Sequence, residues 1–338
     1  MRLASIATPF VAIVLASSTP LGDSPRFAPA EKSALTKTLS SDWKLESESA
    51  AMTFDGKEVP SEKLGLSMSI HEATKVKVTD RYMKVADGRP LELDRTYLEL
   101  VQTSDQTTSM PGMKEPQAEK GVKSSPLEGK TVRFSWNEKD STYATALAGE
   151  ETDGAHLKGK SEDIDVRGHL PAADVKQGDT WDVDGKLFDK LLQPGGNLHF
   201  KKDGDASKSE DSSIQGAGSE LADNVTGKAR CTLANVNKVR GHRIAMITIE
   251  ADLKTHAADI SRGDKGSAGT TTAKATMELE GALLWDLDEG HLANFDLYGK
   301  IELLMQIDGV KESRGEKHDV HLEFKLAGDV RFEIVTDR

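Results

Sequence analysis

Cysteine is almost absent from this chain: among its 338 residues only Cys231 carries a thiol, which excludes an intramolecular disulfide. Hydrophobic burial must therefore hold the fold together, and a chain of this length can build a sizeable core. Cys231 is in phase with Ala229 and Leu233 on the apolar side of an alternating segment. We predict a buried, inert thiol at this position.

Aromatic residues make up only 5% of the chain, so the exposed platforms by which many proteins bind carbohydrate have no support here, although a carbohydrate-binding module stays open as an alternative. Sequence signatures of nucleophilic enzymes and phosphate-binding glycine loops are also missing. His318 and His321 form the only close histidine pair, and at this spacing in a strand they face opposite sides of a sheet, which disfavours a shared metal ion. We therefore expect no catalytic residue, no metal site and no cofactor.

Positive charge is in the minority, with 44 Lys and Arg residues against 56 Asp and Glu residues and a net charge of −12. This balance argues against nucleic acid or an anionic membrane as a partner through bulk electrostatics. Acidic residues gather beside Gly185 and Gly290, as they do in calcium-binding loops. Neither group has the full calcium spacing, and Asp-rich turns with glycine explain them equally well.

No apolar run has the length of a comfortable membrane span. The stretch Leu3–Ala16 follows Met1-Arg2 and leads into small residues, which is the pattern of a secretory signal peptide. A membrane anchor is the alternative, but the stretch is shorter than the ~20 residues that a spanning helix needs. We predict a signal peptide over residues 1–18, no stable membrane span in the mature chain, and export to the periplasm or the extracellular space.

What the chain has in abundance is strict alternation. Along 273–287, 293–307 and 320–334 every second residue is apolar or glycine, and the residues between are mostly polar or charged. A period of two predicts long antiparallel strands with one apolar face. Another hairpin is expected from 229–239 and 243–254, so the C-terminal region should form a meander of about five strands.

Three glycines interrupt the apolar phase of these strands. If the turns are tight, Gly281 lies opposite Leu297 and Gly299 lies opposite Leu326, and the glycines, with Gly328, form a crease. Long strands also twist and bend. We predict a mainly β fold, in which large, half-barrel-like antiparallel sheets curve around one or two short packing helices.

The rest of the chain divides by composition. Residues 19–40 are predicted to be a leader with a short helix over Ala28–Ser40, 41–160 an N-terminal β-rich half, 161–222 a connector, and 223–338 the C-terminal meander. Strands are expected at 43–54, 64–78, 91–101 and 131–136, and a long loop at Thr103–Pro126. In the connector, Gly185–Gln193 has the apolar stripe of a helix.

Two short motifs carry a resemblance. Leu170-Pro171 through Val175 with Gly178-Asp179-Thr180-Trp181, and the later Gly281-Ala282-Leu283-Leu284-Trp285-Asp286 with Gly290-His291, resemble a group of uncharacterised exported bacterial proteins. The resemblance covers the last half of the chain and implies a β-rich exported protein without assigning a site. In fold alone, the expected sheet is similar to periplasmic lipoprotein carriers of the LolA and LppX kind, although such an analogy does not transfer function.

The leading hypothesis is a non-enzymatic exported protein that binds a lipid or another apolar small molecule, or that acts as an envelope scaffold with an envelope protein as partner. The ligand would lie on the concave apolar face, against Leu283, Phe295, Leu303, Met305 and Phe324. In a plainer outcome, the protein's own helices and loops fill that concavity. A hydrolase that acts on envelope material without a recognisable motif is the alternative.

Overall fold

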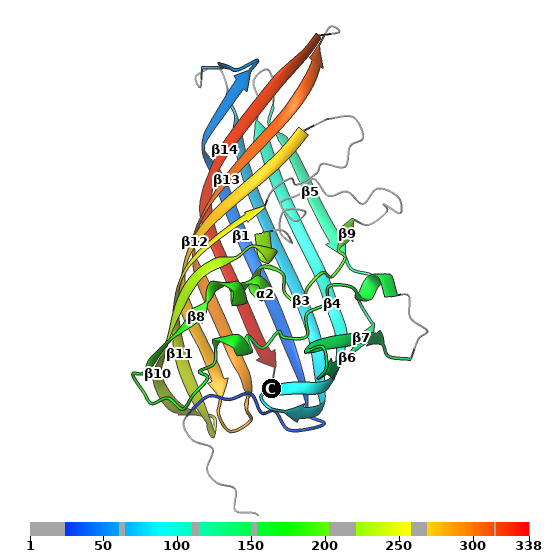
Figure 1. The fold of residues 1–338 in the computed structure, drawn as a ribbon, viewed down its shortest axis with the longest axis vertical. Coiled ribbons are helices and arrows are strands. Elements are labelled where there is room, and N and C mark those ends of the chain that lie inside the picture. Colours follow the sequence, from blue (N-terminus) through cyan, green and yellow to red (C-terminus); the bar gives the residue numbers. More distant parts are fainter. Residues whose placement is uncertain are drawn as a thin grey trace, which may run out of the picture.

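The described residues, which are 24–60, 65–109, 115–149, 154–202, 221–257, 269–313 and 316–337, form one open, 14-stranded antiparallel sheet in the computed structural model. Its long strands curve around a segment of short helices and turns (Figure 1). The predicted fold class, a large curved antiparallel sheet with short packing helices, is confirmed. The predicted signal peptide, residues 1–18, lies outside the described residues.

The alternating segments become the longest strands. The strands are β1 (Ala34–Phe54), β2 (Lys57–Glu58), β3 (Ser67–Ala86), β4 (Arg89–Ser109), β5 (Gln117–Ser124), β6 (Thr131–Asn137), β7 (Thr142–Leu147), β8 (Thr180–Asp184), β9 (Lys201–Lys202), β10 (Thr226–Val239), β11 (His242–Ala257), β12 (Gly269–Asp286), β13 (His291–Ser313) and β14 (Glu316–Asp337). The helical segments are η1 (Gly154–Leu157), η2 (Arg167–His169), η3 (Gly185–Phe188) and α2 (Asp189–Leu192).

The two halves of the chain share one sheet. The strand order is β7-β6-β4-β3-β1-β14-β13-β12-β11-β10-β8, with β2 beside β1 and β5 between β4 and β9. The first long strand, β1, pairs with the last, β14, from Thr36 opposite Asp337 to Phe54 opposite Val320. The N-terminal half and the C-terminal meander are therefore joined edge to edge.

The helix predicted over Ala28–Ser40 is wrong, because β1 already begins at Ala34. Leu35 and Leu39 are four residues apart, a spacing that is typical of one side of a helix but that also returns to the same face of a strand. The residues before β1 close one end of the sheet instead. Phe27 packs between Tyr82 and Trp285, with ring centroids at 5.6 and 6.4 Å.

The long loop predicted over Thr103–Pro126 is also wrong in large part. β4 continues to Ser109, and Gln117–Ser124 returns along it as β5. No period of two is visible here, because polar residues occupy both phases of these two strands. Backbone pairing, which needs no apolar face, builds this part of the sheet.

The predicted hairpins and the predicted connector helix are confirmed. β10 and β11 are joined at Arg240 and Gly241, which both have positive φ (51° and 96°). The helical segment η3 begins at Gly185 and continues into α2, which ends at Leu192. Gly281 lies opposite Leu297, as expected.

The expected partner of Gly299 is wrong: it lies opposite Val330, not Leu326. The β13–β14 hairpin turns later in the chain than assumed, between Ser313 and Glu316. Alternation did not reveal this shift, because moving a strand by an even number of residues keeps every side chain on its face.

The glycines form a crease because there is no room for a side chain. A Cβ on Gly281 would collide with the carbonyl oxygen of Asp296, and one on Gly299 with that of Glu278. A Cβ on Gly328 would collide with the backbone of Lys44, so neighbouring backbones approach closely along this line.

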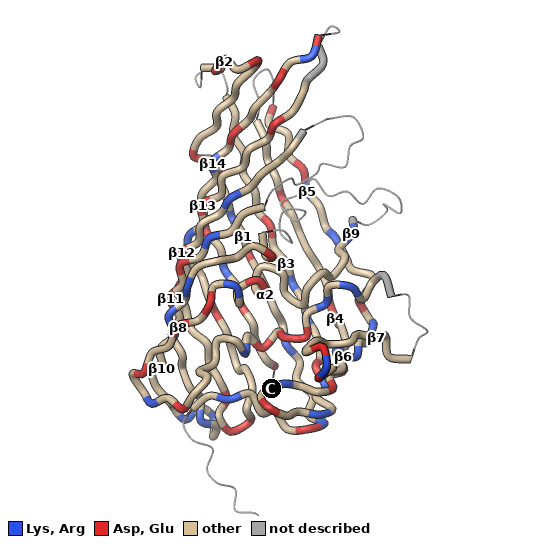
Figure 2. Tube along the Cα trace, viewed as in Figure 1, with Lys and Arg blue, Asp and Glu red and all other residues tan. Residues whose placement is uncertain are grey.

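A separate hollow lies beside the crease on the polar face of the sheet. A groove of about 960 Å³ crosses β1, β14, β13, β12 and β11 there. Its lining includes Glu250, Glu280, Tyr298 and Arg331. Charged residues are distributed along the long strands (Figure 2), and most residues that line the groove are charged or polar, so the groove is a feature of a hydrated surface.

We expect Gly299→Ala to destabilise the protein by about 2 kcal/mol or more, because overpacking must push the β12 backbone away. Gly309→Ala, on the same strand and face, is the matched control, since a Cβ there meets nothing within 4 Å. Urea unfolding of both variants measures the difference. Equal midpoints for the two variants would show that the crease is not a close approach.

Candidate functional site on the inner face of the sheet

The proximal half of the inner face is covered by the protein itself. We call proximal the end of the sheet that carries the turns at Arg240-Gly241 and Asp288–Gly290, and distal the end that carries the β13–β14 tip. The segment 154–202 crosses the proximal half (Figure 1). It contains most of the predicted connector, and we use the name connector for it from here on. From this connector, Phe188 and Leu191 belong to the same buried core as the sheet residues. The plainer outcome, a concavity filled by the protein's own chain, holds for this half.

Two of the five predicted ligand-binding residues lie in this closed core. Leu283 and Phe295 are both 0% exposed. The ring of Phe295 packs against the ring of His169 in the connector, with centroids 6.0 Å apart. These two side chains are therefore packing residues, and a ligand cannot reach them without displacement of the connector.

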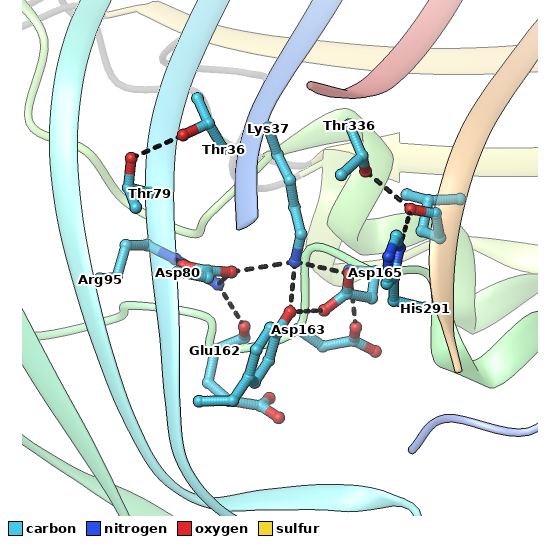
Figure 3. Close-up of polar contacts among 12 residues, drawn as sticks. Thr36, Lys37, Thr79, Asp80, Arg95, Glu162, Asp163, Asp165, His291 and Thr336 are labelled. Atoms are coloured by element: carbon cyan, nitrogen blue, oxygen red, sulfur yellow. Dashed lines mark hydrogen bonds and ion pairs between the residues drawn. The ribbon is translucent and has the colours of Figure 1, made fainter. Parts of the chain in front are cut away.

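A network of buried charges holds the connector against the sheet (Figure 3). Its centre is Asp80 on β3, which lies between two cations from the neighbouring strands. Lys37 Nζ is 3.1 Å from Asp80 Oδ2, and Arg95 Nε is 2.6 Å from Asp80 Oδ1. All three side chains are 0% exposed. Paired and hydrogen-bonded in this way, charges can remain in a low-dielectric interior.

The connector completes the hydrogen bonding of these cations. Arg95 donates through its Nη atoms to the carbonyl oxygens of Ser161 (2.9 Å) and Glu162 (2.6 Å). Lys37 Nζ lies 2.6 Å from Asp165 Oδ1, and the Tyr82 hydroxyl donates to the other oxygen of Asp165 at 2.9 Å. The connector is thus bound through both its backbone and its side chains.

A second group of charges lies within the connector. Arg167 pairs with Glu162 and, at 3.1 Å, with Asp163, and Lys190 from α2 reaches Asp163 at 3.2 Å. Val166, between Asp165 and Arg167 in the chain, has a left-handed backbone, with φ 48° and ψ 37°. That conformation is costly for a β-branched residue and persists only where its surroundings impose it. The flanking ion pairs of Asp165 and Arg167 supply the restraint.

The charged groups at the centre of this network are held in ion pairs and are therefore poorly suited to proton transfer. Burial alone would raise the pKa of Asp80, but Arg95 and Lys37 outweigh burial and hold that pKa below its ordinary value. Burial raises the pKa of Glu162, against the opposing effect of Arg167. A carboxylate whose pKa is lowered by paired cations, as that of Asp80 is, is a poor general base, so the geometry of Asp80 favours a structural role.

Sequence reasoning missed this network, although a signal was present. Lys37, Asp80 and Arg95 occupy the inward phase of strands whose neighbouring inward residues are apolar or aromatic. A single charged residue in an apolar phase is costly unless a partner of opposite charge is buried with it. Three such residues on adjacent strands therefore predict a buried ionic cluster, which the alternation pattern on its own does not show.

The distal half of the inner face has a different character. Its apolar side chains are half-buried and are not part of the main core cluster; they are Met52, Phe54, Ile307, Val320 and Leu322. Leu322 lies opposite both Met52 and Ile307, and Phe54 lies opposite Val320, so the five form a continuous patch over β1, β14 and β13. We call this patch the distal inner face.

The other three predicted ligand-binding residues lie at the boundary between the two halves. Met305 and Phe324 are directly opposite each other on β13 and β14. Phe324 is 2% exposed, and Met305 is half-buried against the edge of the core. Leu303, one step further toward the proximal end, is 3% exposed within the core. The fold brings these three together, but Leu303 and Phe324 are buried as Leu283 and Phe295 are, and of the five predicted residues only Met305 is partly exposed.

The acidic residues beside Gly290 stabilise a turn. The carboxylate of Asp286 accepts the backbone N–H groups of Asp288 (3.0 Å) and Glu289 (2.9 Å). His242, Asp286 and Asp288 offer possible metal-ligand atoms within 4.8 Å of one another, but Arg243 already engages Asp288 at 2.8 Å. A guanidinium at this position opposes the binding of a cation.

The remaining sequence candidates are separated or buried. His318 pairs with Asp55 and His321 with Asp308, so the two histidines do not share a partner. Cys231 is buried, as predicted, and burial raises the pKa of its thiol to about 12, which disfavours the reactive thiolate.

Comparisons with known proteins identify no family. No family model matches the chain, and no curated protein sequence matches it. Among solved structures, an outer membrane channel from Pseudomonas putida F1 aligns over 91% of this chain and 97% of its own, at 11% identity and a TM-score of 0.24. OccK7 (OpdD) from Pseudomonas aeruginosa aligns over 90% and 99%, at 7% identity and a TM-score of 0.16. Scores this low carry no inference about function.

A search for membrane-spanning helices among the described residues found none of sufficient length and apolarity.

We expect Asp80→Asn to cost about 3 to 5 kcal/mol of stability, because it leaves Lys37 and Arg95 buried without their shared counter-ion. Asp94→Asn is the matched control: Asp94 forms a similar bidentate pair with Arg133 on the outer face. There the loss should stay below about 1 kcal/mol. Urea unfolding of both variants measures the two losses of unfolding free energy. Comparable losses would contradict a special role for the buried ion pairs of Asp80.

The pH dependence of stability should report on His169. Burial lowers the pKa of His169 to about 4, whereas an unfolded chain has about 6.5. Between these values the unfolded chain binds more protons, so stability falls as the pH falls, by on the order of 3 kcal/mol. His169→Phe keeps an aromatic ring against Phe188 and removes the titrating group. As the pH is lowered from about 7 to about 4, the denaturation midpoint of His169→Phe should fall less steeply than that of the wild type. Identical slopes would contradict a lowered pKa of His169.

Proposed function

We propose that this protein is a non-enzymatic, exported carrier that holds the hydrocarbon chain of a lipid-like ligand against its distal inner face. The observation that carries the proposal is the continuous apolar patch that remains half-buried after the connector has covered the proximal half. Apolar patches of this kind on a soluble fold mark surfaces that bind something.

The two faces of the sheet support this assignment. On the outer face, ion pairs bridge neighbouring strands, including Arg331 with Asp296 at 2.8 Å and Arg133 with Asp94 at 2.7 Å. Such a surface is built to face water. A ligand that needs an apolar surface therefore has the inner face, and the open part of the inner face is its distal half.

The side chains of the patch suit a ligand with a flexible hydrocarbon chain. Met52 within it and Met305 at its boundary are unbranched and adaptable, so they can follow the shape of different hydrocarbons. Gly309 lies opposite Val320 on the same face, and the space beside it is open, since a Cβ built there meets nothing within 4 Å.

The size of the patch favours reversible binding. Completing the burial of five half-buried apolar side chains contributes on the order of 5 kcal/mol before the cost of association, so the dissociation constant should be no tighter than the range from about a millimolar to a micromolar. A carrier must release its ligand, so an affinity in this range fits the proposed role.

The test places an arginine in the patch. We expect Ile307→Arg to abolish binding of a long-chain fatty acid, because the ligand would have to desolvate the new charge. Val310→Arg is the control on the same strand, since Val310 is 42% exposed on the opposite face. Native mass spectrometry, on protein purified from its exporting host without detergent and then incubated with the fatty acid, measures the complex. Circular dichroism confirms that both variants fold.

A wild-type protein that stays free of ligand under these conditions would overturn the proposal, as would a folded Ile307→Arg variant that binds as well as the wild type. Leu303→Arg is a poor test, because Leu303 is 3% exposed in the core and a charge there would unfold the protein.

A further inference from the structure

One cation in the connector has no carboxylate partner among the residues that the structure describes. Elsewhere in the protein the buried cations are paired, as Lys37 and Arg95 are with Asp80. Lys160, by contrast, is half-buried, and its ammonium donates to the backbone oxygen of Asn197. Within the part of the chain that the structure describes, no Asp or Glu forms an ion pair with it.

Two histidines lie beside this lysine. The rings of His156 and His199 meet edge to face, with centroids 5.7 Å apart. His199 Nε2 is buried and has no hydrogen-bond partner among the described residues. Burial lowers the pKa of His199, and the nearby side chains of Lys160, His156 and Lys201 lower it further. The lysine and the two rings therefore lie in one neighbourhood.

Among the described residues, no negative charge compensates the burial of Lys160. Burial lowers the pKa of its ammonium to about 8, and no described carboxylate opposes this effect. In a protein with a net charge of −12, a half-buried cluster of positive and neutral nitrogen donors is unusual. An anion bound between these donors would remove the cost of their burial.

The backbone holds these side chains in place. Lys160 and Gly196 form an antiparallel bridge, flanked by hydrogen bonds from Asn197 to Gly159 (2.9 Å) and from Ser161 to Gly195 (3.0 Å). Gly196 has a φ of 80°, and a Cβ there would collide with the carbonyl oxygen of Gly159. The two segments that carry Lys160 and His199 are thus clamped together, which lowers the entropic cost of binding a ligand between them.

We propose that Lys160, His156 and His199 form a binding site for a phosphate-type oxyanion, either free phosphate or a phosphomonoester. A tetrahedral dianion accepts hydrogen bonds from several directions, and an ammonium and two imidazole rings can donate them at once. Two N–H bonds of the Lys160 ammonium remain after its contact with Asn197, and His199 Nε2 has no other partner among the described residues.

Isothermal titration with sodium phosphate, at constant ionic strength in chloride buffer near neutral pH, tests the site in the full chain. Lys160→Met and His199→Asn should each weaken binding about tenfold or more, since each removes a charge-assisted donor. Asn tolerates the left-handed backbone that His199 adopts, with φ 52°. Lys158→Met is the matched control, an exposed lysine with the same change of charge, and it should bind phosphate as the wild type does.

A second arm distinguishes the two sources of the anion. Glycerol 3-phosphate that binds as tightly as inorganic phosphate identifies a phosphomonoester site, and loss of binding with the ester identifies a free-phosphate site. No saturable phosphate binding by the wild type, or an equal loss in Lys158→Met, would overturn the proposal.

Nuclear magnetic resonance of the wild-type protein gives a test that does not depend on a variant folding. Phosphate should shift the ring resonances of His156 and His199 and leave those of the distant His318 unchanged; uniform shifts would contradict the site. The site is independent of the proposed apolar ligand, so Ile307→Arg should bind phosphate normally.

Discussion

The ion pairs of Asp80 with Lys37 and Arg95 are the interaction on which the arrangement of this protein depends. All three side chains are fully buried, and an unpaired charge in that environment costs several kcal/mol. Arg95 also donates to two backbone carbonyls of the connector, and Lys37 pairs with Asp165. The connector therefore cannot slide along the sheet without leaving buried charges unsatisfied. Its position is set by charge pairing more strictly than apolar contacts alone would set it.

The docked connector divides the inner face into two parts with different properties. Over the proximal half, Phe188 and Leu191 complete a closed core with Leu283 and Phe295. Over the distal half, the strands of the β13–β14 hairpin continue beyond that core (Figure 1). Their apolar side chains remain half-buried there. The distal inner face thus stays uncovered because the connector, which the ionic network holds in place, covers only the proximal half.

The same connector supports the proposed anion site. The segment that provides Ser161 and Glu162 carbonyls to Arg95 begins just after Lys160, and the antiparallel bridge to Gly196 fixes its course. Within the described residues, Lys160 at the start of this segment has no carboxylate partner. A single stretch of chain therefore links the closed core to the proposed anion site, while the two proposed ligands occupy different parts of the fold.

The sequence by itself determined the strands and their faces, because the period of two in β12, β13 and β14 follows directly from which side chains avoid water. It also determined the partner of Gly281 and the helix beginning at Gly185. Only the tertiary structure decided the register of Gly299, since an even shift preserves every face. It alone revealed that Leu35 and Leu39 belong to a strand and that Leu283 is covered while Ile307 is not. These outcomes depend on pairing between residues far apart in the chain, such as Lys37 with Asp80 and Asp165, and local periodicity carries no information about such pairs.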